Sequence, residues 1–144
     1  MKWFKFLIYF ALFAGAALNA ISGIQMLTGE VYGEYKEYVY AVFEDLKTLD
    51  MIVGILMLAT AALGIYTRFR LAGYYANGPK MLSVVYAMAV LVNLVYISGV
   101  NSILSEAVME SVDTSSSITS MLVSAVMIII NNTYFKKRAH LFVN

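Results

Sequence analysis

The chain has 144 residues, of which 61% are hydrophobic and 13% charged, and its formal net charge at pH 7 is +1. Soluble domains carry about a quarter charged residues, so this composition predicts a chain that is solvated by lipid. The small net charge provides no field that would attract nucleic acid. Because the chain contains no cysteine, disulfides, thiol catalysis and cysteine-ligated metal sites are excluded.

Four apolar stretches are long enough to cross about 30 Å of hydrocarbon as helices. They cover about residues 3–27, 49–66, 81–104 and 118–135. A chain of this length is expected to form one domain, over residues 1–144. The sequence therefore predicts an all-α integral membrane protein built as a four-transmembrane-helix bundle.

The basic residues predict which side of the membrane each loop faces, because short loops rich in Lys and Arg stay in the cytoplasm. All Lys and Arg residues except Lys36 and Lys47 flank the two termini or the loop between the second and third spans. We therefore expect both termini to be cytoplasmic, in a plasma membrane and most simply a bacterial inner membrane. All acidic residues then fall on the extracytoplasmic side, with Asp50 at a helix end, so that no ionisable side chain is expected inside the hydrocarbon.

The first span has an alternative interpretation as a cleaved secretory signal, with Ala14-Gly15-Ala16 as the cleavage site. The apolar run continues to Leu27, which favours a retained transmembrane helix. The sidedness of the later segments is the same under both interpretations.

The loop between the first two spans has a helical pattern of its own. Its apolar positions are Val31, Tyr32, Tyr35, Tyr38, Val39, Val42, Phe43 and Leu46. This spacing predicts an extracytoplasmic amphipathic helix over about residues 30–47, which lies on the outer leaflet or folds over the end of the bundle. Acidic residues between these positions argue against adhesion to anionic lipid and favour a cover or a partner surface.

The two halves of the chain have similar segments. Ile21-Ser22-Gly23-Ile24-Gln25 resembles Ile97-Ser98-Gly99-Val100-Asn101, and the second and fourth spans can be aligned in the same way. The similarity predicts two tandem parallel helical hairpins, related by an axis along the membrane normal. Chance similarity between apolar helices of few residue types is the alternative.

Small and neutral polar residues in the spans are the candidate packing and binding positions. Small residues at four-residue spacing let helices approach closely in lipid, which predicts a packing stripe of Ala11, Gly15 and Gly23. The polar residues either form hydrogen bonds between helices or line an outward-facing polar cavity. These candidates are Asn19, Ser22, Gln25, Asn93, Ser98 and Asn101.

The sequence predicts no catalytic, cofactor-binding or metal-binding residue, and no cofactor. The only histidine, His140, lies in the tail beside a basic cluster, so a histidine-based triad or zinc site cannot be assembled. We expect a non-enzymatic scaffold or accessory subunit that acts through helix and outer-loop contacts. Its expected partners are membrane lipid and a second copy or a larger membrane protein. The alternative is an oligomeric channel or carrier for a neutral small solute or lipid.

Two short segments are similar to a known family. Leu63-Gly64-Ile65-Tyr66-Thr67-Arg68, and more loosely Gly23 to Gly29, resemble the ends of the second and first spans of DoxX-like four-span proteins. The tyrosine-rich outer segment and the loop from Gly73 to Lys80 depart from that pattern. We therefore carry over no function from this resemblance.

Overall fold

The computed structural model describes residues 1–103 and 115–144, which are entirely helical apart from short connections. The elements are α1 (Lys2–Phe6), the π-helix η1 (Leu7–Ala11), α2 (Leu12–Thr28), the 3₁₀ helix η2 (Glu30–Tyr35), α3 (Lys36–Val42), α4 (Glu44–Ala72), α5 (Gly78–Ile103), α7 (Ser115–Lys136) and the 3₁₀ helix η3 (Ala139–Leu141). The described part contains four helices long and apolar enough to cross a membrane, which agrees with the sequence prediction.

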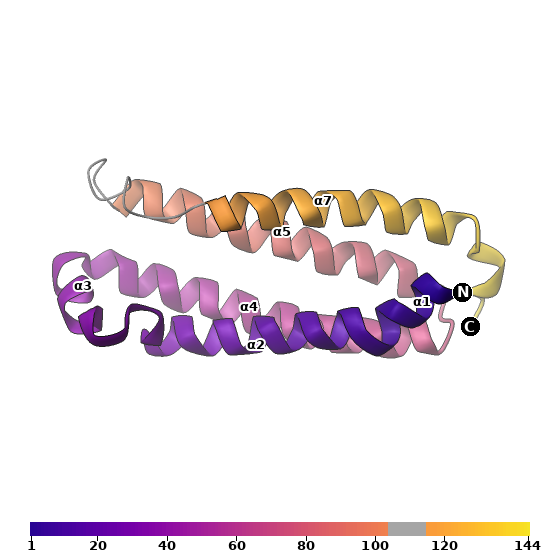
Figure 1. The fold of residues 1–144 in the computed structure, drawn as a ribbon, viewed down its shortest axis with the longest axis horizontal. Coiled ribbons are helices and arrows are strands. Elements are labelled where there is room, and N and C mark those ends of the chain that lie inside the picture. Colours follow the sequence, from indigo (N-terminus) through magenta and orange to yellow (C-terminus); the bar gives the residue numbers. More distant parts are fainter. Residues whose placement is uncertain (104–114) are drawn as a thin grey trace.

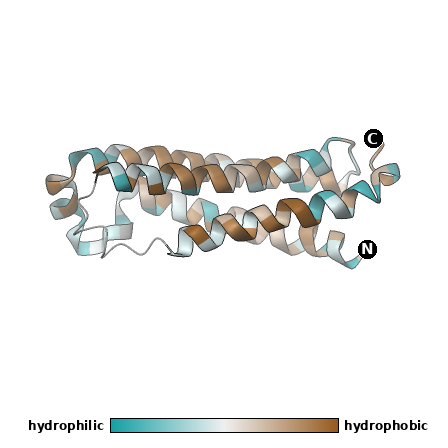
Figure 2. Cartoon of the chain, turned by 90° about the horizontal axis from the view of Figure 1, so that it is seen from above, coloured by the Kyte–Doolittle hydropathy of each residue, from teal (hydrophilic) through white to brown (hydrophobic). Residues whose placement is uncertain are grey.

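The long helices run antiparallel to their neighbours in the chain (Figure 1). The helix formed by α1, η1 and α2 packs along α4, α4 packs on α5, and α5 packs on α7. Both termini lie at one end of the bundle, which we call the termini end, and α3 lies at the opposite end, which we call the α3 end. Figure 2 shows hydrophobic residues along the middle of the helices and hydrophilic residues mainly near the two ends.

The outer loop differs from the single helix expected over residues 30–47. Gly29 ends α2 with a left-handed φ of 75°, and the backbone is non-helical again at Gly33 (φ 56°, ψ −129°). Glycine adopts both conformations without a Cβ penalty, so the segment breaks into η2 and the short α3. Residues 44–47 belong to α4 instead, which starts at Glu44 and extends beyond the expected span at both ends.

Close packing between α2 and α4 depends on two glycines. A Cβ atom added to Gly23 would lie 2.9 Å from the carbonyl oxygen of Gly54, and one added to Gly54 would lie 2.8 Å from that of Gly23. Gly23, one residue of the predicted stripe, lies at this contact. The other two stripe residues, Ala11 and Gly15, border a cavity, and a Cβ at Gly15 would meet no atom of the described residues within 4 Å.

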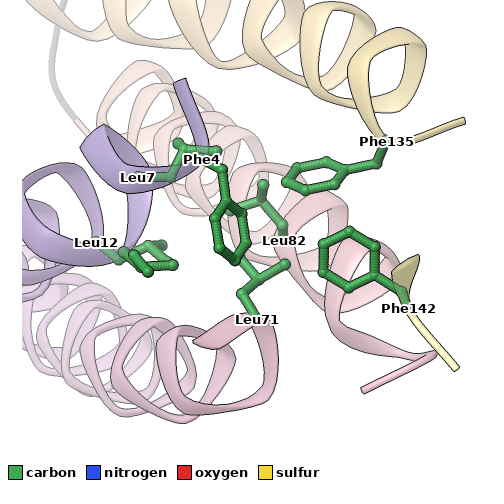
Figure 3. Packing of buried hydrophobic residues seen from close by; sticks show 8 residues of the cluster. Phe4, Leu7, Leu12, Leu71, Leu82, Phe135 and Phe142 are labelled. Carbon is green, nitrogen blue, oxygen red and sulfur yellow. The ribbon is translucent and has the colours of Figure 1, made fainter. Parts of the chain in front are cut away.

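Two clusters of buried apolar residues close the ends of the bundle. The termini-end cluster (Figure 3) contains Phe4, Leu7, Ile8, Leu12, Leu71, Leu82, Phe135 and Phe142. The α3-end cluster contains Met26, Leu46, Leu49, Val53, Val92 and Val100. Large apolar residues such as Leu18, Ile55, Leu122 and Ile129 are exposed between the two ends, as is typical of helices that face lipid.

Candidate functional site

A buried carboxyl group lies beneath the outer segment at the α3 end. Asp50, in the second turn of α4, is 0% exposed. The hydroxyl group of Tyr40, from α3, donates a hydrogen bond to its Oδ2 over 2.9 Å. Tyr32 from η2 and Tyr96 from α5 lie near the same carboxyl group. Its other oxygen, Oδ1, has no hydrogen-bond donor among the residues that the structure describes.

The Tyr40–Asp50 hydrogen bond holds α3 against the bundle. Burying a carboxyl group without partners is costly, so loss of the tyrosine donor would leave Asp50 in an unfavourable environment. The rings of Tyr32 and Tyr40 meet edge to face with centroids 5.5 Å apart, and both pack against the α3-end cluster. The outer segment is therefore fixed by the polar contacts of Tyr40 and Tyr32 with Asp50 and by apolar packing.

Burial and the Asp50 carboxyl group also change the acidity of these tyrosines, which lie beyond the end of α2. Burial, together with the hydrogen bond to Asp50, raises the pKa of Tyr40 to about 12. The pKa of Tyr32 is raised by burial and by the nearby Asp50. Both hydroxyl groups stay protonated at neutral pH, so Tyr40 remains a hydrogen-bond donor.

The position of Asp50 differs from the expectation that this residue lies at the end of the second span. The sequence placed Asp50 at the end of a helix starting near residue 49. Because α4 starts at Glu44, Asp50 is instead inside the helix and under the outer segment. Its tyrosine partners come from three other elements, and no local sequence pattern marks them as its neighbours.

The opposite side of the outer segment is exposed. Tyr35 and Tyr38 are 71% and 70% exposed, and the carboxylates of Glu34 and Glu37 lie beside them in the chain and are also exposed. We call these four residues the acidic tyrosine face. Tyrosine is enriched among the residues that dominate binding energy at protein interfaces, and the carboxylates give this surface a negative charge.

A cavity of about 100 Å³ lies in the middle of the bundle, between α2, α4, α5 and α7. Its polar lining residues are Asn19, Thr60, Tyr86 and Ser124. The Thr60 hydroxyl donates to the carbonyl oxygen of Leu56 in its own helix, over 2.8 Å. Polar groups and a volume of this size are sufficient to hold a few water molecules.

The predicted polar cluster is spread over several environments. Asn19 lines the central cavity. The side-chain amide of Asn93 donates to the carbonyl oxygen of Ala89 (2.8 Å) and, more weakly, to Oγ of Ser120 on α7 (3.5 Å). Of the remaining candidates, Ser22 is half-buried, whereas Gln25, Ser98 and Asn101 are exposed. Convergence of Gln25 and Asn101 on an outward-facing cavity stays a prediction.

The sequence interpretation missed two asparagines that hold α7 in place. The indole N–H of Trp3 donates to Oδ1 of Asn131 over 2.9 Å. The hydroxyl group of Ser83 donates to Oδ1 of Asn132 over 2.7 Å. The first bond joins α7 to α1 and the second joins α7 to α5, so the pair orients α7 near the termini end. In the sequence, only their polarity within an apolar stretch distinguishes these two asparagines as candidates for contacts between helices.

No protein-family model matches the chain, and neither the curated proteins nor the solved structures include a significant match to it. The short resemblance to DoxX-like proteins is thus not accompanied by a family match.

Proposed function

We propose that the protein is an integral membrane protein that acts, without enzymatic activity, as a scaffold or accessory subunit. In this proposal it binds a larger membrane protein through the acidic tyrosine face, and its lipid-facing helices contribute further contacts. The observation that carries the proposal is the two-sided outer segment. Tyr40 is tied to the buried Asp50 on one side, while Tyr35 and Tyr38 are presented to the surroundings on the other.

The chemistry of this face specifies the kind of partner. A tyrosine ring offers a large apolar area with few rotatable bonds and a hydroxyl group, and Glu34 and Glu37 favour a partner with basic side chains. A surface with Arg or Lys residues on the extracytoplasmic side of another membrane protein provides this complement. The hydrogen bond beneath α3 supports preorganisation, which lowers the entropy cost of binding.

In this proposal the protein lies in a plasma membrane, such as the bacterial inner membrane. Both termini face the cytoplasm. This orientation is supported by the location of both termini at one end of the bundle and by the concentration of Lys and Arg residues at that end. The α3 end, with the acidic tyrosine face, would then be extracytoplasmic.

The tandem-hairpin organisation is a further part of the proposal. It is supported by the antiparallel pairing of α2 with α4 and of α5 with α7. The equivalent glycines differ in their partners, because Gly23 packs against Gly54 whereas Gly99 leaves space for the side chain of Leu49. Such a difference is compatible with two repeats that have specialised separately.

Site-specific photocrosslinking in native membranes tests the scaffold proposal. A photoreactive phenylalanine at position 38 should give one heteromeric product of fixed mass, and the same group at the exposed, lipid-facing position of Leu18 should give less of this product. Substitution of both Glu34 and Glu37 by Gln should weaken the product. Crosslinking of position 38 only to another copy of the chain, or equally from both positions, would contradict the proposal.

The central cavity favours the second candidate, a channel or carrier for a neutral small solute or lipid. Its polar lining comes from all four long helices, as a pathway through the bundle would require. Flux of a neutral solute into proteoliposomes, blocked by Ser124→Leu, would favour this candidate over the scaffold. Absence of flux for water and small neutral solutes from reconstituted, folded protein would remove it.

A further inference from the structure

A second cavity, at the termini end, has a different chemistry from the central one. It measures about 290 Å³, opens between α1, η1 and the end of α4, and is lined by two cationic side chains, Lys5 and Arg68. Its other lining residues are Met1, Phe4, Ile8, Tyr9, Ala72 and Tyr74. Among the residues that the structure describes, no acidic residue lines this cavity, so its positive charge is not neutralised from within.

Arg68 is fixed in place, yet part of its guanidinium group is available. Its Nε donates to the carbonyl oxygen of Ile8, in the π-helix, over 3.0 Å. Its Cζ lies 5.0 Å and 5.1 Å from the ring centroids of Phe13 and Phe69, within the range of cation–π interactions. Nη1 and Nη2 make no hydrogen bond to any residue in the described part of the chain. These two groups can therefore donate to a ligand without breaking the contacts that orient the side chain.

The π-helix strengthens this interpretation, because π-helical turns within longer helices occur frequently at functional sites. Here the turn η1 (Leu7–Ala11) contributes both the Ile8 carbonyl group that positions Arg68 and two residues of the cavity wall. Arginine recognises phosphate by a pair of parallel N–H donors, and a nearby lysine adds a point charge.

We propose that this cavity binds the phosphate of an anionic phospholipid headgroup. The apolar wall formed by Phe4, Ile8 and Tyr9 continues onto exposed apolar residues of the same helix, such as Phe10 and Phe13. An acyl chain can follow that surface while the phosphate contacts Arg68 and Lys5. A soluble phosphate compound would use the charges but not this apolar surface. The inference depends on the proposed membrane location but is independent of any protein partner.

Native mass spectrometry of the protein in a mild detergent tests the site. Phosphatidylglycerol and phosphatidylcholine with the same acyl chains are compared, and we expect preferential retention of phosphatidylglycerol. Lys5→Gln should lower the affinity for phosphatidylglycerol about fivefold, the effect of one basic group near an anionic membrane surface. Lys5 is exposed, so this substitution preserves the folded core.

Arg70→Gln is the matched control. It removes one positive charge from the same end of the bundle, but Arg70 stacks on Tyr75 and donates to Asn77 outside the cavity. Its effect should be less than about twofold. Equal losses for Lys5→Gln and Arg70→Gln would show diffuse attraction and overturn the proposal, as would equal retention of phosphatidylcholine.

Two further measurements separate the remaining outcomes. Competition by millimolar inorganic phosphate would identify a site for free phosphate and would overturn the lipid assignment. Resistance of the protein to alkaline extraction from membranes checks the membrane location separately. If the protein resists extraction but does not retain phosphatidylglycerol in preference to phosphatidylcholine, the proposed lipid site is wrong while the membrane proposal stands.

Discussion

The hydroxyl group of Tyr40 donates a hydrogen bond to Oδ2 of the fully buried Asp50, and this bond joins the short helix α3 to the long helix α4. It links an exposed, tyrosine-rich surface to the interior of the bundle. The proposed function depends on this link, because the link holds the acidic tyrosine face in a defined position.

Removing the Tyr40 hydroxyl group should loosen α3. In Tyr40→Phe the ring is kept but Asp50 loses this donor, and we expect the segment to be destabilised by about 1–2 kcal/mol. Hydrogen exchange of the amides of residues 36–42 measures the effect. Tyr38→Phe removes an exposed hydroxyl group from the same helix and should leave exchange unchanged. Equal exchange in both variants would contradict the anchoring role of Tyr40.

Alkaline pH should release the outer segment. The pKa of Tyr40 is raised from 10.0 to about 12 by burial and by its hydrogen bond to Asp50. The folded state therefore keeps a proton that the unfolded state loses, so this stabilisation is complete below pH 10 and disappears as the pH rises towards 12. The tyrosinate absorbance is measured against pH in wild type and in Tyr40→Phe, and the difference between the two curves isolates Tyr40. This difference should have its midpoint near pH 12. A midpoint near 10 would contradict the buried contact.

The Gly23–Gly54 contact should be intolerant of a methyl group. Gly23→Ala and Gly54→Ala each place a Cβ within 3 Å of a backbone carbonyl oxygen, so each should destabilise the protein by roughly 1–3 kcal/mol. Gly15→Ala is the control, because a Cβ there meets no atom within 4 Å in the part of the chain that the structure describes. Unfolding in detergent measures all three. A loss for Gly15→Ala equal to that for Gly23→Ala would argue against the observed α2–α4 packing.

Trp3, the only tryptophan, reports on the position of α7. Asn131→Ala removes the acceptor of its indole N–H, so we expect a shift in fluorescence emission and a destabilisation of about 1–2 kcal/mol. Asn132→Ala removes the Ser83 contact but leaves the indole bonded, and it should leave the emission maximum unchanged. Identical emission in wild type and Asn131→Ala would exclude the contact.

The helical fold could be predicted from the sequence because hydrocarbon thickness dictates the length of an apolar stretch. Helix ends were less predictable. The second span was expected to end near residue 66, before the charged Arg68 and Arg70, but α4 continues through both residues. Their guanidinium groups lie over aromatic rings and donate hydrogen bonds to nearby oxygen atoms. Such compensation depends on tertiary contacts that the local composition does not reveal.

The candidate site was only partly predictable. Helical spacing of tyrosines indicated an amphipathic outer segment, but glycines at 29 and 33 shortened its helix. The stripe through Gly23 indicated a close helix contact without identifying Gly54 as its partner. The burial of Asp50 could not be predicted, because it arises from the folding of η2 and α3 over the end of the bundle.

The mass of the complex extracted from native membranes in a mild detergent shows whether the protein has a partner at this face. We expect a heteromer of fixed stoichiometry that dissociates in the double variant Tyr35→Ser, Tyr38→Ser, while the bundle of this variant stays folded. A monomer or homo-oligomer in wild type, or a heteromer unaffected by the double substitution, would contradict the claim that the protein binds a partner through its acidic tyrosine face.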